Sequence, residues 1–347
     1  MTRVALLFGG ISTEHDISCK SASNVIQALD GRFDLVLIGI TREGRWVLCP
    51  AGTEVESGAW ESDGSLSPVA LLPGAGLAEV AGEDVRPLSV DIVLPVLHGQ
   101  GGEDGTVQGA LEVAGLPYVG CGVMASAVCM DKDAAHRLAA AAGVRSPRCE
   151  VLWRGCSAEA RTAAVEACGG YPVFVKPARG GSSIGVSRAE DAASYEAAIE
   201  AAFALDEKVA VEEAITGVEV GCAITGDVLR GTSMGEIDEI VVSGGGFFRI
   251  HLEKDPGANT QLRCPSELPA DLLVRVREAG TAVYEALGCE GLARVDLFVT
   301  PEGEVVFNEV NSMPGLTYYS RFPQMMRVAG HELGDVLSGL IEDRLSR

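Results

Sequence analysis

Two neighbouring segments late in the sequence combine the residue types of a site for a hard metal ion. Arg294 and Asp296 lie two positions apart in a strand-like apolar run, and Glu309 and Asn311 end the next such run. Because side chains alternate along a strand, each pair shares a face, and a turn at 300–303 would join the faces as a hairpin. Two carboxylates and an amide oxygen suit Mg²⁺, which takes few carboxylates together with nucleotide phosphates. An adjacent guanidinium can neutralise an oxyanion or a phosphate.

A second segment is typical of phosphate binding. Lys176 ends a strand-like run and precedes a loop at 180–185 that is rich in glycine and serine, including Ser182 and Ser183. Backbone N–H groups of such a loop can close around an anion, and the lysine adds a positive charge. No Walker A motif occurs in the chain. A Gly-Ser loop alone indicates only a flexible turn, but its combination with the predicted metal site favours a bound phosphate.

A weaker pattern concerns a nucleotide base. The strand-like run 209–211 leads into Glu212, Glu213 and Ile215, and Glu219 follows a few residues later. An edge strand that enters an interdomain hinge can offer a backbone carbonyl and N–H to adenine, and a later carboxylate can accept the ribose hydroxyls. Acidic residues in such a turn are usually only solvated, so this pattern by itself supports little.

The elements that must position these residues alternate between strands and helices. Apolar runs at Val4–Phe8, Asp34–Ile40 and Asp91–Leu97 alternate with helical patterns, which predicts a parallel α/β sheet for roughly the first 120 residues. Ligands of such sheets bind at the carboxyl ends of strands. The segments 9–14 and 98–105 both follow strands and are therefore expected near a ligand.

We expect three units. These are an N-terminal α/β domain at 1–122, a smaller α+β lobe at 123–213 and a C-terminal α+β lobe at 214–347. Within the last, the segment 243–262 has little periodicity and contains two adjacent phenylalanines. Because long irregular segments in compact domains are usually functional, this one is predicted to be a lid.

A strongly acidic composition limits the partners of this protein. Its 347 residues include 27 Lys and Arg against 49 Asp and Glu, a net charge of −22. Such a field repels nucleic acid and anionic lipid, so neither is an expected partner. Ten scattered cysteines without C-x-x-C spacing contain no zinc or redox motif and suit a reducing compartment. With no apolar run of about 18 residues and no signal-peptide pattern, we expect a cytoplasmic protein.

Six motifs in order resemble the D-alanine–D-alanine ligase family of the ATP-grasp superfamily. They are LFGGISTEHDIS at 7–18, LHGQGGEDGTVQG at 97–109, YVGCG with SAVCMDK at 118–132, YPVFVKPARGGSSIG at 171–185, GCEGLARVDLF at 288–298 and FNEVNSMPGLT at 307–317. The resemblance covers nearly the whole chain. It implies an α/β three-domain ATP-grasp fold, in which the two α+β lobes sandwich ATP.

The resemblance also implies roles for individual residues. The residues implied to bind ATP are Lys132, Lys176, Ser182, Ser183, Glu212, Glu213, Ile215, Glu219 and Asn308. Those implied to bind two Mg²⁺ ions, with Mn²⁺ as an alternative, are Asp296, Glu309 and Asn311. Those implied to contact the amino-acid substrates or the oxyanion are Glu14, His98, Arg294, Gly315, Ser320 and Arg321. A homodimer is expected on the same ground.

The lid departs from the family's usual pattern. Ordinary members carry a lid tyrosine, whereas this chain has Phe-Arg-Ile-His at 248–251. That sequence and Ser320–Met326 resemble the vancomycin-resistance D-alanine–D-lactate ligases. A protonated His251 would repel the ammonium of D-alanine and favour the neutral hydroxyl of D-lactate. We therefore expect D-alanine, D-lactate and ATP as substrates and a D-alanyl phosphate intermediate.

Three alternatives stay open at this point. The nearest is a D-alanine–D-alanine or D-alanine–D-serine ligase of cell-wall synthesis. Another is an ATP-grasp ligase for other substrates, which Glu14 and Ser320 disfavour, and the third is a nucleotide sensor without catalytic activity, which the Arg294 cluster disfavours. Gly180 stands where the family often has a larger polar residue, and no function follows from it.

Overall fold

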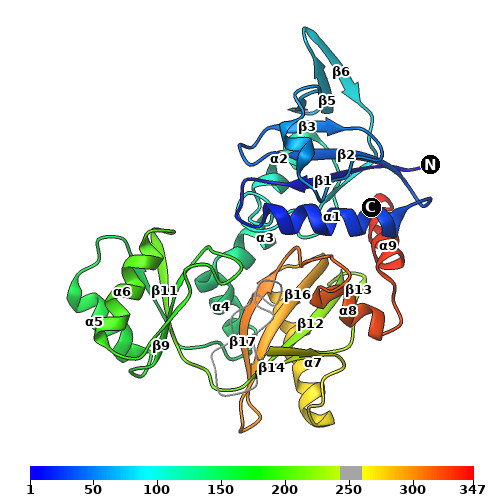
Figure 1. The fold of residues 1–347 in the computed structure, drawn as a ribbon. Coiled ribbons are helices and arrows are strands. Elements are labelled where there is room, and N and C mark those ends of the chain that lie inside the picture. Colours follow the sequence, from blue (N-terminus) through cyan, green and yellow to red (C-terminus); the bar gives the residue numbers. More distant parts are fainter. Residues whose placement is uncertain (243–259) are drawn as a thin grey trace.

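The computed structural model describes residues 1–242 and 260–347, which form three units (Figure 1). The N-terminal unit contains β1 (Arg3–Gly9), α1 (His15–Leu29), β2 (Asp34–Ile40), β3 (Trp46–Cys49), the 3₁₀ helix η1 (Ala59–Ser62), β4 (Val69–Leu72), β5 (Gly76–Ala81), β6 (Asp84–Leu88), β7 (Ile92–Pro95) and α2 (Thr106–Ala114). Its main sheet has the order β3-β2-β1-β7. Strand β1 is parallel to β2 and β7, which confirms the predicted parallel sheet, while β3 is antiparallel to β2.

A second sheet in this unit was not predicted. Strands β4, β5 and β6 form an antiparallel meander that projects from the main sheet (Figure 1). Sequence patterns miss it because β6 is exposed at four of its five positions, so no apolar run marks it.

Glycine ends β1 for a steric reason. Gly9 has a φ of +88°, and a Cβ at this position would lie 2.3 Å from the carbonyl oxygen of Ile40. Only glycine allows the chain to turn here so closely against β2. The turn leads directly into the loop that carries Glu14.

The central segment folds around a four-stranded antiparallel sheet of order β10-β9-β11-β8. Its elements are α3 (Val123–Met130), α4 (Lys132–Ala141), β8 (Cys149–Trp153), α5 (Ala158–Ala167), β9 (Val173–Pro177), β10 (Ser187–Ala189), α6 (Ala192–Phe203) and β11 (Lys208–Glu213). Helices α5 and α6 cover one face of this sheet and share its apolar core. Helices α3 and α4 contribute instead to the core of the C-terminal unit. The domain limits expected at 122 and 213 stay predictions.

The C-terminal unit is built on a larger antiparallel sheet of order β15-β14-β12-β16-β17, with β13 paired to β12. Its elements are β12 (Val218–Asp227), β13 (Gly231–Met234), β14 (Asp238–Val242), β15 (Thr260–Arg263), α7 (Ala270–Ala286), β16 (Gly291–Val299), β17 (Val305–Asn311), α8 (Arg321–Val328) and α9 (Leu333–Leu345). Helix α7 packs into the apolar core on one face of the sheet, which leaves the other face for polar groups. No helix in the described ranges is long and apolar enough to cross a membrane.

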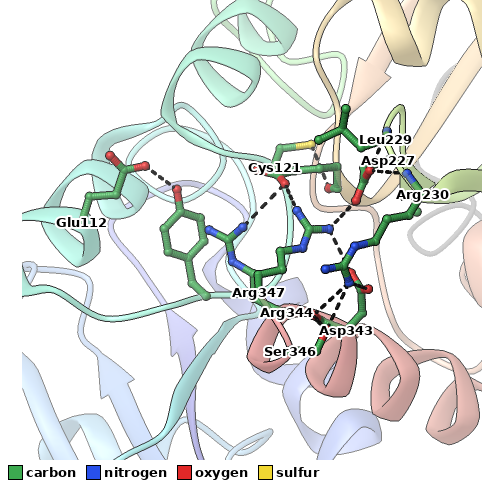
Figure 2. Close-up of polar contacts among 12 residues, drawn as sticks. Glu112, Cys121, Asp227, Leu229, Arg230, Asp343, Arg344, Ser346 and Arg347 are labelled. Carbon is green, nitrogen blue, oxygen red and sulfur yellow. Dashed lines mark hydrogen bonds and ion pairs between the residues drawn. The ribbon is translucent and has the colours of Figure 1, made fainter.

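The last helix joins the N-terminal and C-terminal units. Helix α9 packs against α1, and its apolar residues belong to the same hydrophobic core as Val4, Leu6 and Phe8 of β1. Beyond it, Arg347 donates to Glu290 at 2.8 Å and pairs with Asp227 (Figure 2). The guanidinium of Arg344 lies 5.5 Å from the centre of the Tyr118 ring. Single surface ion pairs contribute little, but this connected group spans the two units and helps fix their orientation.

Candidate active site

The predicted hairpin, which carries Arg294 and Asp296 on one strand and Glu309 and Asn311 on the next, is confirmed. Strands β16 and β17 pair antiparallel, with Arg294 opposite Asn311 and Asp296 opposite Glu309. The Arg294 guanidinium donates from Nε at 2.8 Å and from Nη2 at 2.7 Å to the two carboxylate oxygens of Asp296. The amide of Asn311 donates to Asp296 at 3.1 Å. The four side chains therefore share one face of the sheet and adjoin each other.

A second arginine organises the carboxylates of this face. Arg321 donates from Nε and Nη2 to both oxygens of Asp238, each at 2.8 Å, and from Nη1 to Glu219 at 2.7 Å. The same Nη1 lies 3.3 Å from Asp296. Burial would raise the pKa of Asp296, but Arg294 and Arg321 outweigh it and hold this pKa below its usual range.

The pKa of Glu219 is shifted in the opposite direction. Burial, with the nearby Asp296 charge, raises it to about 7, although Arg321 opposes the shift. Sequence reasoning predicted neither this Arg321 pairing nor the involvement of Asp238. The detectable signal was an aspartate inside the apolar strand pattern of 236–242.

Glycine at position 221 makes room for the second arginine. A Cβ on Gly221 would lie 2.6 Å from Nη2 of Arg321 and 2.6 Å from Oδ1 of Asp238. The guanidinium thus lies directly over the backbone of β12 at Gly221, where a larger residue would clash with it.

Replacing Gly221 with alanine should therefore destabilise the fold. We expect a loss of about 1–3 kcal/mol in the free energy of unfolding, because the methyl group displaces a buried ion pair. Chemical denaturation measures this. A Cβ on Gly339 in α9 would meet no described atom within 4 Å, so G339A is the control. It should be neutral or stabilising by about 0.5–1 kcal/mol, and equal effects of the two substitutions would contradict the steric argument.

The loop at 180–185, which is predicted to bind phosphate, lies beside the hairpin. Lys132, at the start of α4, donates to the carbonyl of Gly180 at 2.7 Å and lies 3.5 Å from Oε2 of Glu309. Ser182 and Ser183 have φ values of 48° and 53°, a region that residues other than glycine rarely occupy. Such strain is typical of functional loops and turns successive N–H groups toward one side. The structure thus brings the lysine, the loop and a predicted metal ligand together.

The same loop contacts the N-terminal unit. The Ser182 hydroxyl donates to the Glu14 carboxylate. This glutamate stands at the start of α1, after the turn at Gly9, so the contact spans two units. The residues implied for substrate and phosphate therefore meet.

A partly buried lysine and a buried glutamate lie on the sheet of the central lobe. Lys176 Nζ is 2.6 Å from Oε2 of Glu212, while Oε1 of Glu212 is buried and accepts no hydrogen bond among the described residues. Burial opposes both charges, yet their attraction raises the pKa of Lys176 and lowers that of Glu212. An unsatisfied buried carboxylate oxygen indicates a ligand position. Ile215 follows in the loop after β11, partly buried.

The side chain of Glu213 does not join this group. It lies on the opposite face of β11 and binds Arg145 and Arg148, both at 2.8 Å. Only its backbone is left for the predicted nucleotide contact. The backbone carbonyl of Asn308 accepts a hydrogen bond from Nε2 of His136 at 2.9 Å, and the predicted contact of Asn308 with ATP stays a prediction.

His98 is fixed in one tautomer. Its Nδ1 lies 2.9 Å from the carbonyl of Met313, so this nitrogen must carry the proton, and Nε2 accepts from the Ser21 hydroxyl at 3.1 Å. Burial lowers the pKa of His98, which keeps the ring neutral. His98 thus links helix α1 to the segment after β17.

The predicted second-substrate residues lie at the start of α8. Ser320 is the N-cap of this helix, and its hydroxyl lies 2.6 Å from that of Thr317. A Cβ on Gly315 would lie 2.8 Å from Oγ of Ser320, so these two positions adjoin. A helix N-terminus favours a carboxylate. His251 and the lid residues up to 259 lie outside the described residues.

A buried carboxylate that sequence reasoning missed connects the loop at 98–105 to the segment that follows β17. Glu103 accepts the N–H of Gly99 at 2.8 Å and that of Met313 at 3.2 Å. Burial, assisted by the Glu14 charge, raises its pKa to about 8. Its position in the Gly-rich segment 98–105 was the only sequence signal.

This shift predicts a pH-dependent stability. The folded state binds the Glu103 proton more tightly than the unfolded state, so its stabilising contribution is complete below about pH 4.5 and is lost as pH rises toward about 8. The variant E103Q removes this slope because its amide does not titrate, although its NH2 group cannot accept one of the two backbone N–H bonds, which adds a loss of stability that does not depend on pH. Denaturation across pH should show the wild type losing stability relative to E103Q. The exposed Glu83 supplies the control E83Q, and parallel curves for wild type and E103Q would contradict the assignment.

The fold and this site together define an ATP-grasp ligase. A family model for the D-Ala–D-Ala ligase N-terminus matches residues 3–121, and one for the C-terminus matches 138–342. The chain belongs to the D-alanine–D-alanine ligase family, and the family implies use of ATP and a divalent metal ion. The predicted family and fold class are thus confirmed.

Individual relatives match over almost their whole length. The chain is 43% identical to the vancomycin B-type resistance protein VanB of Enterococcus faecalis, over 99% of both. It is 44% identical to a Streptomyces coelicolor protein assigned as a D-alanine–D-lactate ligase, over 96% of this chain and 95% of that one. The crystal structure of the VanG D-Ala:D-Ser ligase of Enterococcus faecalis superposes with a TM-score of 0.89, at 41% identity over 99% of both chains.

Proposed function

We propose that this enzyme joins D-alanine to D-lactate with ATP, through a D-alanyl phosphate, and gives a depsipeptide peptidoglycan precursor that resists glycopeptide antibiotics. The observation that carries the ligase chemistry is the cluster of Arg294, Asp296, Glu309 and Asn311 beside Lys132. Likeness to VanB and to the Streptomyces protein supports the ester product.

The first step activates a carboxylate. A carboxylate is a poor acyl donor, so phosphoryl transfer to D-alanine must precede coupling, and this transfer needs charge neutralisation and alignment. Lys132, Lys176 and the loop N–H groups hold the phosphates, while Glu14 holds the ammonium of D-alanine. Asp296, Glu309 and Asn311 fit two Mg²⁺ ions, or Mn²⁺, because all offer hard oxygen atoms. Ions held by these residues would neutralise charge on the triphosphate.

The second step forms a tetrahedral oxyanion. Arg294 and the N–H of Gly315 stabilise it, and the carboxylate of the second substrate binds Ser320 at the start of α8. Asp238 and Glu219 engage all three guanidinium nitrogens of Arg321, so Arg321 mainly holds this helix end in place. Exclusion of water protects the acyl phosphate from hydrolysis.

The choice of D-lactate rests on His251. A protonated imidazole repels an ammonium and tolerates a hydroxyl, so the ester-to-amide ratio should be highest near about pH 6 and fall toward about pH 9. The test supplies D-alanine with D-lactate, counts ADP release and weighs the products. In H251Y the amide should gain most near about pH 6, where the imidazole is protonated, and little near about pH 9, where the imidazole is neutral.

Rising pH also frees the amine of D-alanine, so a control must separate the two effects. His331 is exposed and lies in the turn before α9, so H331Y should leave the ratio and its pH profile unchanged. A profile that H251Y does not alter would overturn the role of His251. A dominant D-alanyl-D-serine or D-alanyl-D-alanine product would overturn D-lactate but keep the ligase chemistry.

We propose further that the enzyme acts in the cytoplasm as a homodimer, with no nucleic acid or membrane partner. The net charge of −22 supports the absence of those partners. Light scattering at several concentrations tests the dimer, and a constant monomer mass would contradict it.

A further inference from the structure

Two residues that each carry a buried polar atom without a partner lie close together, outside the hairpin of β16 and β17. Among the described residues, Nδ1 of His136 and Oε1 of Glu212 make no hydrogen bond, although the two residues are only 4% and 2% exposed. Cys149 completes the group, and one ligand atom from each residue lies within 4.8 Å of the others. Unsatisfied atoms at this depth call for an unseen partner.

The fold holds this group from three elements. Cys149 begins β8 directly opposite Glu212 on β11, so their side chains share a face of the sheet. His136 comes from α4, which packs against the C-terminal unit. A cavity of about 680 Å³ beside them is lined by His136, Cys149, Asp133 and Lys208 among others, and gives a solvent path.

The histidine has the arrangement of a metal ligand. Its Nε2 donates to the carbonyl of Asn308 at 2.9 Å, which leaves the lone pair of Nδ1 free. Metal-binding histidines nearly always donate their other ring N–H to a carbonyl or carboxylate in this way. Glu212 is similarly fixed, because Lys176 holds its second oxygen at 2.6 Å.

We propose that His136, Cys149 and Glu212 form a site for a divalent transition-metal ion of the zinc class. Nitrogen, sulfur and oxygen donors suit Zn²⁺, while Mg²⁺ prefers oxygen alone, so this site is chemically separate from the hairpin. In a tetrahedral site with bonds of about 2.0–2.3 Å, ligand atoms stand roughly 3.3–3.8 Å apart. Small side-chain rotations are sufficient, and a cavity water fills the fourth position.

Binding changes the protonation of one group. The Cys149 thiol gives its proton to solvent as the sulfur–metal bond forms, so one proton is released per ion bound. Burial, with the Glu212 charge, raises the pKa of this thiol, so it stays protonated until a metal binds. No oxidant or other co-reactant is required.

The site also bears on nucleotide binding. Glu212 is one of the residues proposed to bind ATP, so an ion on its free oxygen should weaken ATP binding. This consequence rests on the proposed function, whereas the metal site itself does not. Zinc would then act as an inhibitor that competes with ATP.

The first experiment measures binding of Zn²⁺ alone to the full chain without nucleotide, by competition with a chromogenic chelator. We expect one tightly bound ion, with affinity lowered at least about 10-fold in C149S and in H136Q. Co²⁺ should show a thiolate charge-transfer band that C149S removes. C156S, which changes a cysteine of similar exposure, and C129S, which breaks the Cys129–Cys289 contact of 3.6 Å, should bind like the wild type.

The outcomes separate the two claims. Absence of a tight ion in the wild type, or affinity unchanged in both C149S and H136Q, would overturn the site. Zinc should raise the KM for ATP in the wild type more than in C149S, and equal increases would overturn the competition. If ATP does not bind with or without zinc, the proposed function fails while the binding result still supports the metal site.

Discussion

Replacing Arg294 with methionine should lower kcat/KM by about 10²–10³-fold, the loss that follows removal of one oxyanion donor. The guanidinium lies on the strand face that carries Asp296, Glu309 and Asn311 together. In the structure it donates to Asp296 from Nε and Nη2. Asp296 would hold a metal ion that would supply positive charge, while the paired N–H donors of Arg294 would stabilise the oxyanion. Lysine keeps the charge but lacks the planar, paired N–H donors of a guanidinium, so the kcat/KM of R294K should lie between those of the wild type and R294M.

Steady-state rates with ADP detection measure this effect. Arg277 on α7 is the matched control, because it binds Glu236 at 2.8 Å on the other side of the same sheet. R277M should keep nearly full activity. Thermal unfolding of R294M separates a catalytic loss from a folding defect. Equal activities of R294M and R277M, both folded, would remove Arg294 from the mechanism.

Replacing Arg321 with methionine should lower the free energy of unfolding by about 3–5 kcal/mol, the usual cost of removing one partner of a buried ion pair. Its guanidinium contacts Asp238, Glu219 and Asp296, all nearly inaccessible to solvent. Without it, three buried carboxylates face each other. Protonation relieves that repulsion, so the destabilisation should be smaller near about pH 5 than near about pH 8.

Chemical denaturation at both pH values tests this. The double variant D238N/R321M should recover part of the loss, since it also removes the carboxylate that Arg321 binds through two nitrogens. R45M is the surface control, because Arg45 is 67% exposed and its pair with Glu43 is long at 3.7 Å. It should change stability by less than about 0.5 kcal/mol. A loss in R321M no larger than that in R45M would contradict the central role of Arg321.

Local geometry explains which site residues the sequence could predict. The pairing of Arg294 and Asp296 with Glu309 and Asn311 follows from the alternation of side chains and a short turn, both of which are properties of the chain itself. The loop at 180–185 that follows Lys176 was recognisable from its glycines and serines, which are also a local property of the chain. Alternation also predicts that Glu212 and Glu213 lie on opposite faces of their strand. Only the fold shows that Glu212 pairs with Lys176, whereas Glu213 pairs with Arg148.

Contacts between distant segments depended on the tertiary structure. Arg321 meets Asp238 across 83 positions, and Glu103 meets Met313 across 210, so no local pattern could pair them. The group of His136, Cys149 and Glu212 has no motif spacing, because a helix and two strands from different parts of the chain supply it. The sequence by itself determined the ligase family, the fold class and the pairing of residues in the hairpin, since these depend on residue order and strand periodicity. Packing between units decided which buried charges meet, because only the fold sets their distance and their separation from water.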